Sequence, residues 1–166
     1  IRSSFLLFGP LLHRFGKCLI PNPGGCRIGA RPIDRITDAL QALGANISYS
    51  SETGYYEASL PKSPSGSCTF AKSTHTGTEA VILLAAKSPE TVVIHNAALE
   101  PEIDNLIDFL NLAGAQIKRD GADIICQGSA TLNVTEPFDV VEDRNEAVTF
   151  AAMAYATKGD ITITNI

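Results

Sequence analysis

One cysteine of this chain is followed closely by two arginines in a loop rich in glycine and proline. The loop spans residues 21–32, and Cys26 stands next to Arg27 and five residues before Arg31. Positive charge near a thiol favours the thiolate, so this cysteine has the setting of a reactive thiol. The alternative is that Gly24 and Gly25 only form a turn and that Cys26 has no chemical role. The local sequence favours the two interpretations about equally.

The other three cysteines indicate neither a metal site nor a disulfide framework. Cys18 and Cys126 lie in apolar, strand-like runs and are expected to be inert core residues, whereas the setting of Cys68 is undecided. No two cysteines form a Cys-x-x-Cys pair, which favours a reduced intracellular compartment and argues against zinc or iron–sulfur binding. Because no dinucleotide fingerprint is present either, we expect no metal and no organic cofactor.

A second polar stretch, residues 73–79, stands directly before a predicted apolar helix. It carries hydroxyl groups, His75 and a glycine, and backbone N–H groups at a helix N-terminus can hold a phosphate. The alternative is an ordinary helix cap, with Thr76 or Thr78 capping and Glu79 favoured by the helix dipole. Caps are far commoner than phosphate sites, and His75 is expected to be a hydrogen-bonding loop residue.

A third stretch, residues 96–102, links a predicted strand to a predicted helix. It places Glu100 and Glu102 at the start of that helix. The positive end of the helix dipole stabilises acidic residues there, so we assign them this role rather than catalysis.

The composition is that of a globular protein of about one domain. The chain has 166 residues, 13 Lys plus Arg, 18 Asp plus Glu, a net charge of -5 and 45% hydrophobic residues. The acidic balance argues against nucleic acid or an anionic membrane as a partner through bulk charge, and it allows an anionic small ligand. The longest apolar stretch, residues 5–12, is too short to span a bilayer. The first residue is Ile1 rather than Met, which suggests a piece of a longer protein.

An internal repeat predicts the elements that position these residues. Residues 34–47 recur seventy positions later as residues 104–117, and each copy predicts an amphipathic helix followed by a short strand. Gly44 and Gly114 lie where a helix C-terminal cap is expected, because glycine tolerates the left-handed conformation. The last copy stops at Ile166, just after its first predicted strand.

The other half of the unit also repeats, as a helix followed by a strand. We expect helices at residues 78–86, 147–156 and 3–12, followed by strands at residues 91–95, 160–164 and 17–20. Helices that are apolar nearly all round are expected to be buried. The sequence therefore predicts an α/β fold with helices inside and sheets around them.

The chain resembles the UDP-N-acetylglucosamine enolpyruvyl transferases, also called 1-carboxyvinyltransferases, along its whole length. The resemblance is carried by Pro23-Gly24-Gly25-Cys26, Ile28-Gly29-Ala30-Arg31-Pro32 with Asp34, Arg2-Ser3-Ser4 with Gly9-Pro10-Leu11, Asn96-Ala97-Ala98 with Glu100-Pro101-Glu102-Ile103, and Asp143-Arg144 with Glu146 and Thr149-Phe150. It implies an inside-out α/β barrel built from repeated βαβαββ-type units. Residues 1–140 would form most of one domain, and residues 141–166 the hinge and the first helix and strand of a second.

The resemblance also implies the chemistry. The family transfers the enolpyruvyl group of phosphoenolpyruvate to the 3-hydroxyl of UDP-N-acetylglucosamine in the first committed step of peptidoglycan synthesis, in the cytoplasm. The loop cysteine, here Cys26, would protonate phosphoenolpyruvate or bind it covalently, and fosfomycin would alkylate it. The substrate-binding residues that the resemblance implies are Arg2, Arg31, Pro32, Ile33, Asp34, Ser73, His75, Thr76 and Gly77.

Several positions depart from the family pattern. Ser73 and His75 stand where the best-known members have Lys and Ser, and the chain lacks a Lys-Asn pair and most of the second domain. Two alternatives remain: the shikimate-pathway enolpyruvyl transferase, which the Cys loop argues against, and a non-catalytic sugar-nucleotide-binding homologue, which the altered 73–79 loop keeps open.

Overall fold

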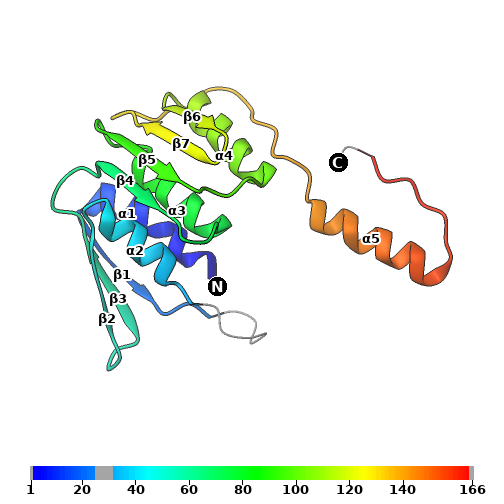
Figure 1. The fold of residues 1–166 in the computed structure, drawn as a ribbon, viewed down its shortest axis with the longest axis horizontal. Coiled ribbons are helices and arrows are strands. Elements are labelled where there is room, and N and C mark those ends of the chain that lie inside the picture. The colour runs from blue at the N-terminus through cyan, green and yellow to red at the C-terminus, as the bar shows by residue number, and fades with distance from the viewer. Residues whose placement is uncertain (1, 25–31, 165–166) are drawn as a thin grey trace.

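The computed structural model describes residues 2–24 and 32–164. It contains two successive copies of one supersecondary unit, followed by a single separate helix (Figure 1). The first copy comprises η1 (Arg2–Leu7), α1 (Phe8–Phe15), β1 (Lys17–Pro21), α2 (Asp34–Ala42), β2 (Asn46–Ser50) and β3 (Tyr55–Ser59). The second comprises β4 (Gly66–Thr69), α3 (His75–Ala85), β5 (Thr91–His95), α4 (Pro101–Leu112), β6 (Gln116–Asp120) and β7 (Asp123–Gln127), and α5 (Arg144–Thr157) follows.

The two sheets have matching topology. The first has the order β1-β3-β2 and the second β4-β5-β7-β6, so the last three strands of each unit pair in the same order. Both β1 and β2 run antiparallel to β3, and both β5 and β6 run antiparallel to β7. In the second unit β4 pairs in parallel with β5 across α3, which completes a βαβαββ unit. The repeated unit predicted from the sequence is therefore confirmed.

Glycine ends the corresponding helix in each unit. Gly44 has a φ of 99° and Gly114 a φ of 108°, a conformation that side chains other than hydrogen strongly disfavour. The next residue, Ala45 or Ala115, donates its N–H to Leu40 or Leu110 in the last turn of the helix. The two predicted helix ends are confirmed, and each turns the chain directly into the following strand.

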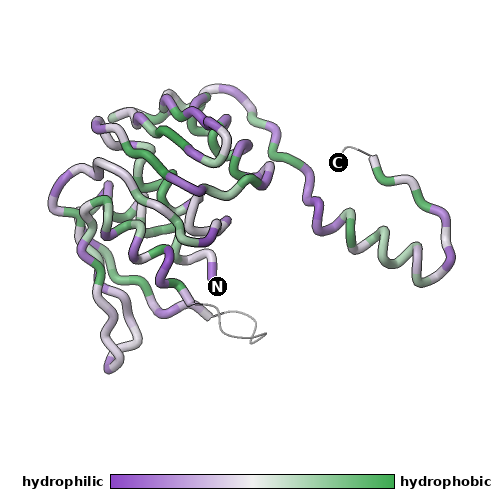
Figure 2. The backbone as a smooth tube through the Cα atoms, in the orientation of Figure 1, coloured by the Kyte–Doolittle hydropathy of each residue, from purple (hydrophilic) through white to green (hydrophobic). Residues whose placement is uncertain are grey.

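The core is built around α3, which packs against η1, α1, α2 and α4. Val81, Ile82 and Leu84 of this helix are fully buried. At Gly9 on α1, a Cβ atom would lie 2.7 Å from the backbone carbon of Leu83, so only glycine permits this close approach of the two helices. Helices α1, α2 and α3 thus lie inside, between the two sheets (Figure 1), and the two units that contain them form the body on the left of Figure 2.

The last predicted helix and strand differ from expectation. The helix forms as α5, but none of its residues is buried, and its mostly apolar sequence stands apart from the two units (Figure 2). Residues 160–164 were expected to form a strand, and this prediction is wrong for the structure described. The reason is the same in both cases: a strand needs a neighbour for its backbone N–H and C=O groups, and an apolar helix needs a partner surface. No helix within residues 2–24 and 32–164 is long and apolar enough to cross a membrane.

Candidate functional site

The structure describes eight of the ten residues predicted for the site. Cys26 and Arg31 lie outside the described residues. The other eight are Arg2, Pro32, Ile33, Asp34, Ser73, His75, Thr76 and Gly77. They form two groups, one at the flank of the Cys loop and one at the N-terminus of α3.

The first group connects the start of the chain to the end of the Cys loop. Arg2 donates a hydrogen bond from Nη2 to the backbone oxygen of Pro32 over 3.3 Å, thirty positions along the chain. Ile33 is buried, and its backbone oxygen accepts from Ile36 in the first turn of α2. Asp34, the first residue of α2, is exposed at the positive end of the helix dipole. A guanidinium and an exposed carboxylate therefore stand where the loop rejoins the fold.

The loop's other flank is also anchored. Asn22 donates its N–H to the Gly54 carbonyl over 2.8 Å, which ties the end of β1 to the turn between β2 and β3. Both described flanks, Asn22 and Pro32, are therefore hydrogen-bonded to other parts of the fold.

The second group lies at the start of α3, which begins earlier than predicted. Thr74, rather than Thr76 or Thr78, is the N-cap: its backbone is extended, and its hydroxyl accepts from the Gly77 N–H over 3.4 Å. His75 is thus the first helical residue and not a loop residue. A capping residue needs an extended backbone, which Thr76 and Thr78 within the helix do not have.

Two contacts fix the position of this helix start. Thr78 is fully buried, donates to the Thr74 carbonyl over 2.8 Å and accepts from the Ala98 N–H over 3.0 Å. A Cβ atom at Gly77 would lie 2.4 Å from the Thr74 side chain and 3.0 Å from the Phe70 ring, so a larger residue does not fit. Gly77 donates its N–H to the Thr74 hydroxyl and Thr78 to the Thr74 carbonyl, so the N–H groups of His75 and Thr76 are the ones that a helix start leaves for an anion.

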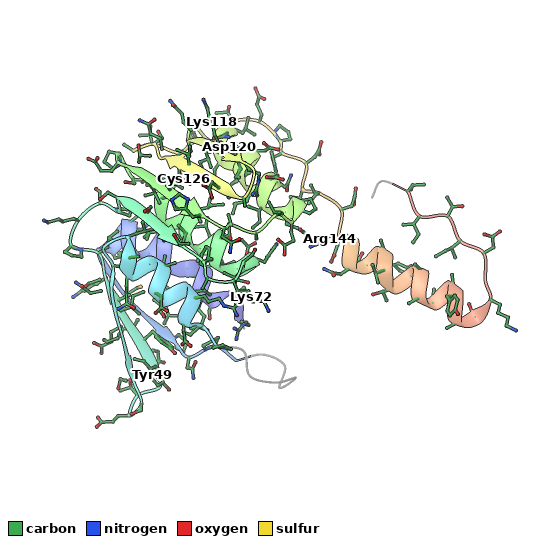
Figure 3. The ribbon with its side chains drawn as sticks, viewed as in Figure 1. Tyr49, Lys72, Lys118, Asp120, Cys126 and Arg144 are labelled. Carbon is green, nitrogen blue, oxygen red and sulfur yellow. The ribbon has the colours of Figure 1, made fainter. Side chains whose placement is uncertain are left out.

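Lys72 adds a cation beside this helix start that the sequence analysis missed. It is exposed and lies two residues before the Thr74 cap (Figure 3). Its position directly before the polar stretch is the signal that could have identified it.

Carboxylates surround the imidazole of His75. Its Nδ1 lies 3.5 Å from Glu79 Oε2, and its Nε2 lies 3.8 Å from Glu102 Oε2. Burial raises the pKa of Glu79, and the nearby charges of Glu102 and Glu100 raise it further, whereas His75 lowers it. The cluster thus combines one imidazole with three acids at the start of two helices.

Glu102 also makes an ion pair that the sequence analysis did not foresee. Its Oε1 accepts a hydrogen bond from Arg144 Nε over 2.8 Å, and this bond is the main reason that the pKa of Glu102 lies below its usual range. The predicted dipole role holds for its position in the first turn of α4, but the carboxylate is also bound to the first residue of α5.

Comparison with models of known protein families identifies the family of this chain. The family model described as EPSP synthase (3-phosphoshikimate 1-carboxyvinyltransferase) matches residues 1–166.

The chain belongs to the EPSP synthase family.

Curated relatives narrow the position of the chain within the EPSP synthase family. Proteins from Desulfosudis oleivorans and Trichlorobacter lovleyi are each 45% identical to it and are named UDP-N-acetylglucosamine 1-carboxyvinyltransferase. The matches cover 99% and 98% of this chain but 39% of each relative, so the chain spans well under half of their length. These names confirm the resemblance found in the sequence.

Solved structures confirm the enolpyruvyl transferase fold. The enolpyruvyl transferase NikO from Streptomyces tendae has a TM-score of 0.75 over 90% of this chain and 36% of its own, at 16% identity. An EPSP synthase from Acinetobacter baumannii has a TM-score of 0.67 over 92% of this chain and 34% of its own, at 20% identity. At such low identity the likeness concerns the fold alone.

The described cysteines of this EPSP synthase family member are poorly suited to thiol chemistry. Burial raises the pKa of Cys68 to about 11 and that of Cys126 to about 12. The prediction that Cys126 belongs to the core is confirmed, and Cys68, left undecided by the sequence, is buried with it. Cys18 is only half-buried, with its pKa raised by that burial. Within the described residues, no group of three or more His, Cys, Asp or Glu side chains could hold a metal ion.

Proposed function

We propose that the chain is part of a UDP-N-acetylglucosamine 1-carboxyvinyltransferase. The observation that carries this proposal is that relatives 45% identical over almost the whole chain have that name. The substrates would be phosphoenolpyruvate and UDP-N-acetylglucosamine, and the product would enter peptidoglycan synthesis. Since both substrates are metabolites of the cytoplasm, we place the protein there.

The reaction forms one C–O bond and breaks another. The 3-hydroxyl oxygen of the sugar bonds to C2 of phosphoenolpyruvate while C3 gains a proton. The tetrahedral adduct then loses phosphate from C2 and a proton from C3, which restores the double bond in the enolpyruvyl ether. Cys26 would supply the proton to C3, because its arginine neighbours favour an ionisable thiol beside an anionic substrate. The proton of the sugar hydroxyl would pass to a base in the second domain.

Charge neutralisation is assigned to the arginines at the Cys loop. Arg31 follows Cys26 by five residues, and Arg2 is held against Pro32, at the end of the same loop. The positive charges of these two arginines would stabilise the phosphate of phosphoenolpyruvate as it leaves. Pro32, Ile33 and Asp34 would hold the uridine end, and the buried Ile33 keeps this segment in a fixed place.

The diphosphate is assigned to the N-terminus of α3. Residues 73–77 include the N–H groups of His75 and Thr76, which precede the first hydrogen bond of the helix, and Thr78 holds that end against the loop before α4. Lys72 stands next to the position where the best-known members have a lysine, so it is the cation that we expect to replace that lysine.

We also propose that a second domain begins near residue 141. Helix α5 resembles α3 in being apolar nearly all round, yet α3 is buried and α5 is exposed. Residues 1–140 would then form most of one domain, and residues 141–166 the hinge and the first helix of the next. An active site between two domains needs both for positioning and charge stabilisation.

Phosphate release by the complete protein tests the proposal. With phosphoenolpyruvate and UDP-N-acetylglucosamine, we expect turnover by the complete protein and none above background by the 166-residue chain. Cys26→Ser should abolish or strongly reduce turnover without unfolding the protein, whereas Cys26→Asp should retain some, because a carboxyl group can also donate a proton.

Three results separate the alternatives. Turnover with shikimate 3-phosphate in place of the sugar nucleotide would identify the shikimate-pathway reaction. Binding of UDP-N-acetylglucosamine without turnover would identify a non-catalytic homologue. Full activity of the Cys26→Ser protein would exclude Cys26 as the proton donor.

A further inference from the structure

A chain of charged contacts runs from the proposed diphosphate site to the start of α5. His75 begins α3, Glu102 lies in the first turn of α4, and Arg144 is the first residue of α5. Glu102 contacts both of the others, through Oε2 to His75 at 3.8 Å and through Oε1 to Arg144 at 2.8 Å. Figure 3 shows Arg144 where the chain leaves the two repeated units.

The Glu102 carboxylate depends on the positive charge of both partners. Its Oε2 atom is shielded from solvent and accepts no hydrogen bond within the described part of the chain. A shielded carboxylate oxygen depends on nearby positive charge, because water cannot compensate it. Movement of Arg144 would therefore leave His75 as the nearest cationic group described around this oxygen.

The segment that carries Arg144 is held over a cavity by few polar contacts. The cavity measures about 730 Å³, and both His75 and Glu102 line it. Its walls also include α4 and the segment of residues 134–145, with Phe109 and Phe138 in edge contact. Apart from the ion pair of Arg144, the hydrogen bonds between α4 and this segment in the described part of the chain are those of Asn105, which donates to the Asp139 carbonyl and accepts from the Val141 N–H.

We propose that Glu102 and Arg144 are positioning residues, which make the state of His75 at the diphosphate site depend on where α5 and the second domain stand. The proposal rests on the proposed function, because it takes the N-terminus of α3 as the place of the diphosphate. It adds a series of contacts through which movement of the second domain would affect the diphosphate site.

We infer that Arg144 and Glu102 act on the diphosphate site by changing the protonation of His75. A neutral imidazole has one N–H and can donate to Glu79 or to Glu102, whereas an imidazolium has two and can serve both. While Arg144 compensates Glu102, less positive charge is needed on His75. Both carboxylates already face the ring, so withdrawal of Arg144 would leave the charge of Glu102 uncompensated and favour a second N–H on the ring, which also favours a bound anion.

Charged groups from every neighbouring element contribute to this balance. Glu79 comes from α3, Glu100 from the preceding loop, and Glu102 from α4. Residues 142–145 bring Arg144 together with the acids Glu142 and Asp143, and Glu136 lines the same cavity. Most of these groups are acidic. The cations are Lys72, exposed three residues before His75, and Arg144, which is the one paired with Glu102.

The first test is an NMR titration of His75 in the complete protein with ¹³C-labelled histidine, assigned with a His75→Gln variant. Arg144→Gln should move the titration midpoint of His75 upward and Glu102→Gln should move it downward, while Arg144→Lys should stay near wild type. Arg119→Gln is the matched control. Arg119 also pairs with an acid of α4, Asp104, at 2.5 Å, but neither of these residues forms an ion pair with His75. A midpoint that both variants leave unchanged would overturn the proposal.

The second test is calorimetric binding of UDP-N-acetylglucosamine at several pH values. Arg144→Gln should change the affinity by about two- to fivefold, as expected for one partly exposed ion pair. The same change made in a His75→Gln background should have little further effect, because the two residues act through one route. Additive effects of the two substitutions would refute the coupling.

The two tests keep the inference separate from the function on which it rests. If the sugar nucleotide does not bind at all, the proposed function fails, and the NMR titration still decides whether Arg144 and Glu102 control His75. If the nucleotide binds and the midpoint of His75 does not move in either variant, the function stands and the inference is wrong.

Discussion

The cysteines should differ in reactivity by orders of magnitude, and the structure supplies the size of the difference. The pKa of Cys68 is about 11 and that of Cys126 about 12, both because of burial. At about pH 8, about one in a thousand Cys68 thiols and one in ten thousand Cys126 thiols are then ionised, against about one in four for an ordinary cysteine. Since the thiolate is the reacting species, ionisation alone should slow alkylation of Cys68 about two hundredfold and that of Cys126 about two thousandfold.

Fosfomycin turns this contrast into a test of the proposed site. This small phosphonate epoxide should alkylate Cys26 selectively, because Arg27 and Arg31 follow that residue closely in the same loop. The reaction should be faster in the presence of UDP-N-acetylglucosamine, which would close the two domains around the loop. Peptide mass mapping of the complete protein, with and without the sugar nucleotide, measures both effects.

A neutral alkylating reagent provides the control. Iodoacetamide has no phosphonate, so its rates should follow ionisation and access alone, with half-buried Cys18 ahead of the buried Cys68 and Cys126. Comparable labelling of Cys68 and Cys26 by iodoacetamide in the folded protein would refute the burial argument. Fosfomycin labelling that is spread over the cysteines, or indifferent to the sugar nucleotide, would contradict the transferase site.

Three further substitutions in the complete protein probe the scaffold, and thermal and urea unfolding measure each. Gly9→Ala places a Cβ 2.7 Å from the Leu83 backbone and should cost about 1–3 kcal/mol by forcing α1 from α3; an unchanged stability would contradict this packing. Thr78→Val leaves the Ala98 N–H without its acceptor and should cost about 1–3 kcal/mol, with Thr78→Ser as the milder control. Glu79→Gln should stabilise the protein at neutral pH, because a raised pKa means that folding loses stability as pH rises and the carboxyl ionises. That gain should vanish in acid, where Glu79 is protonated, and a gain of equal size at both pH values would rule out ionisation as its cause.

The fold was predictable where the signal is local. Apolar spacing and a following glycine located the helices now seen as α2 and α4, and Gly44 and Gly114 adopt the left-handed conformation that such ends require. The β-branched run at residues 91–95 became β5 with the predicted bounds. Each of these depends on residues within one turn or one strand, which a sequence displays directly.

Prediction failed where the outcome depends on distant partners. Residues 160–164 have the composition of a strand but have no paired neighbour in the structure described. The start of α3 was placed too late because the capping residue is selected by backbone conformation, and Thr74, Thr76 and Thr78 offer similar side chains.

The candidate site also has features that the sequence predicts and features that depend on distant partners. The Cys loop and the 73–77 stretch stood out by composition, and the structure supplies anchors for both, from Arg2 to Pro32 and from Thr78 to Ala98. The pair of Glu102 with Arg144 joins residues 42 positions apart. Charge alone does not select this partner from the many other acids and bases of the chain, so the pair needed a structure to be found.

The contrast between helices α3 and α5 supports the proposal that a second domain completes the site. Both are apolar nearly all round, and such a helix is stable only when it is covered, because short helices gain most of their stability from packing. Helix α3 is covered by η1, α1, α2, α4, β5 and β7, whereas Val148, Phe150 and Met153 of α5 are about half exposed or more. More than half of each curated relative lies outside its match to this chain, which is ample sequence for a second layered unit around α5. Since Arg144 holds the start of α5 at Glu102, that unit would lie directly beside the N-terminus of α3, where we propose that the diphosphate binds.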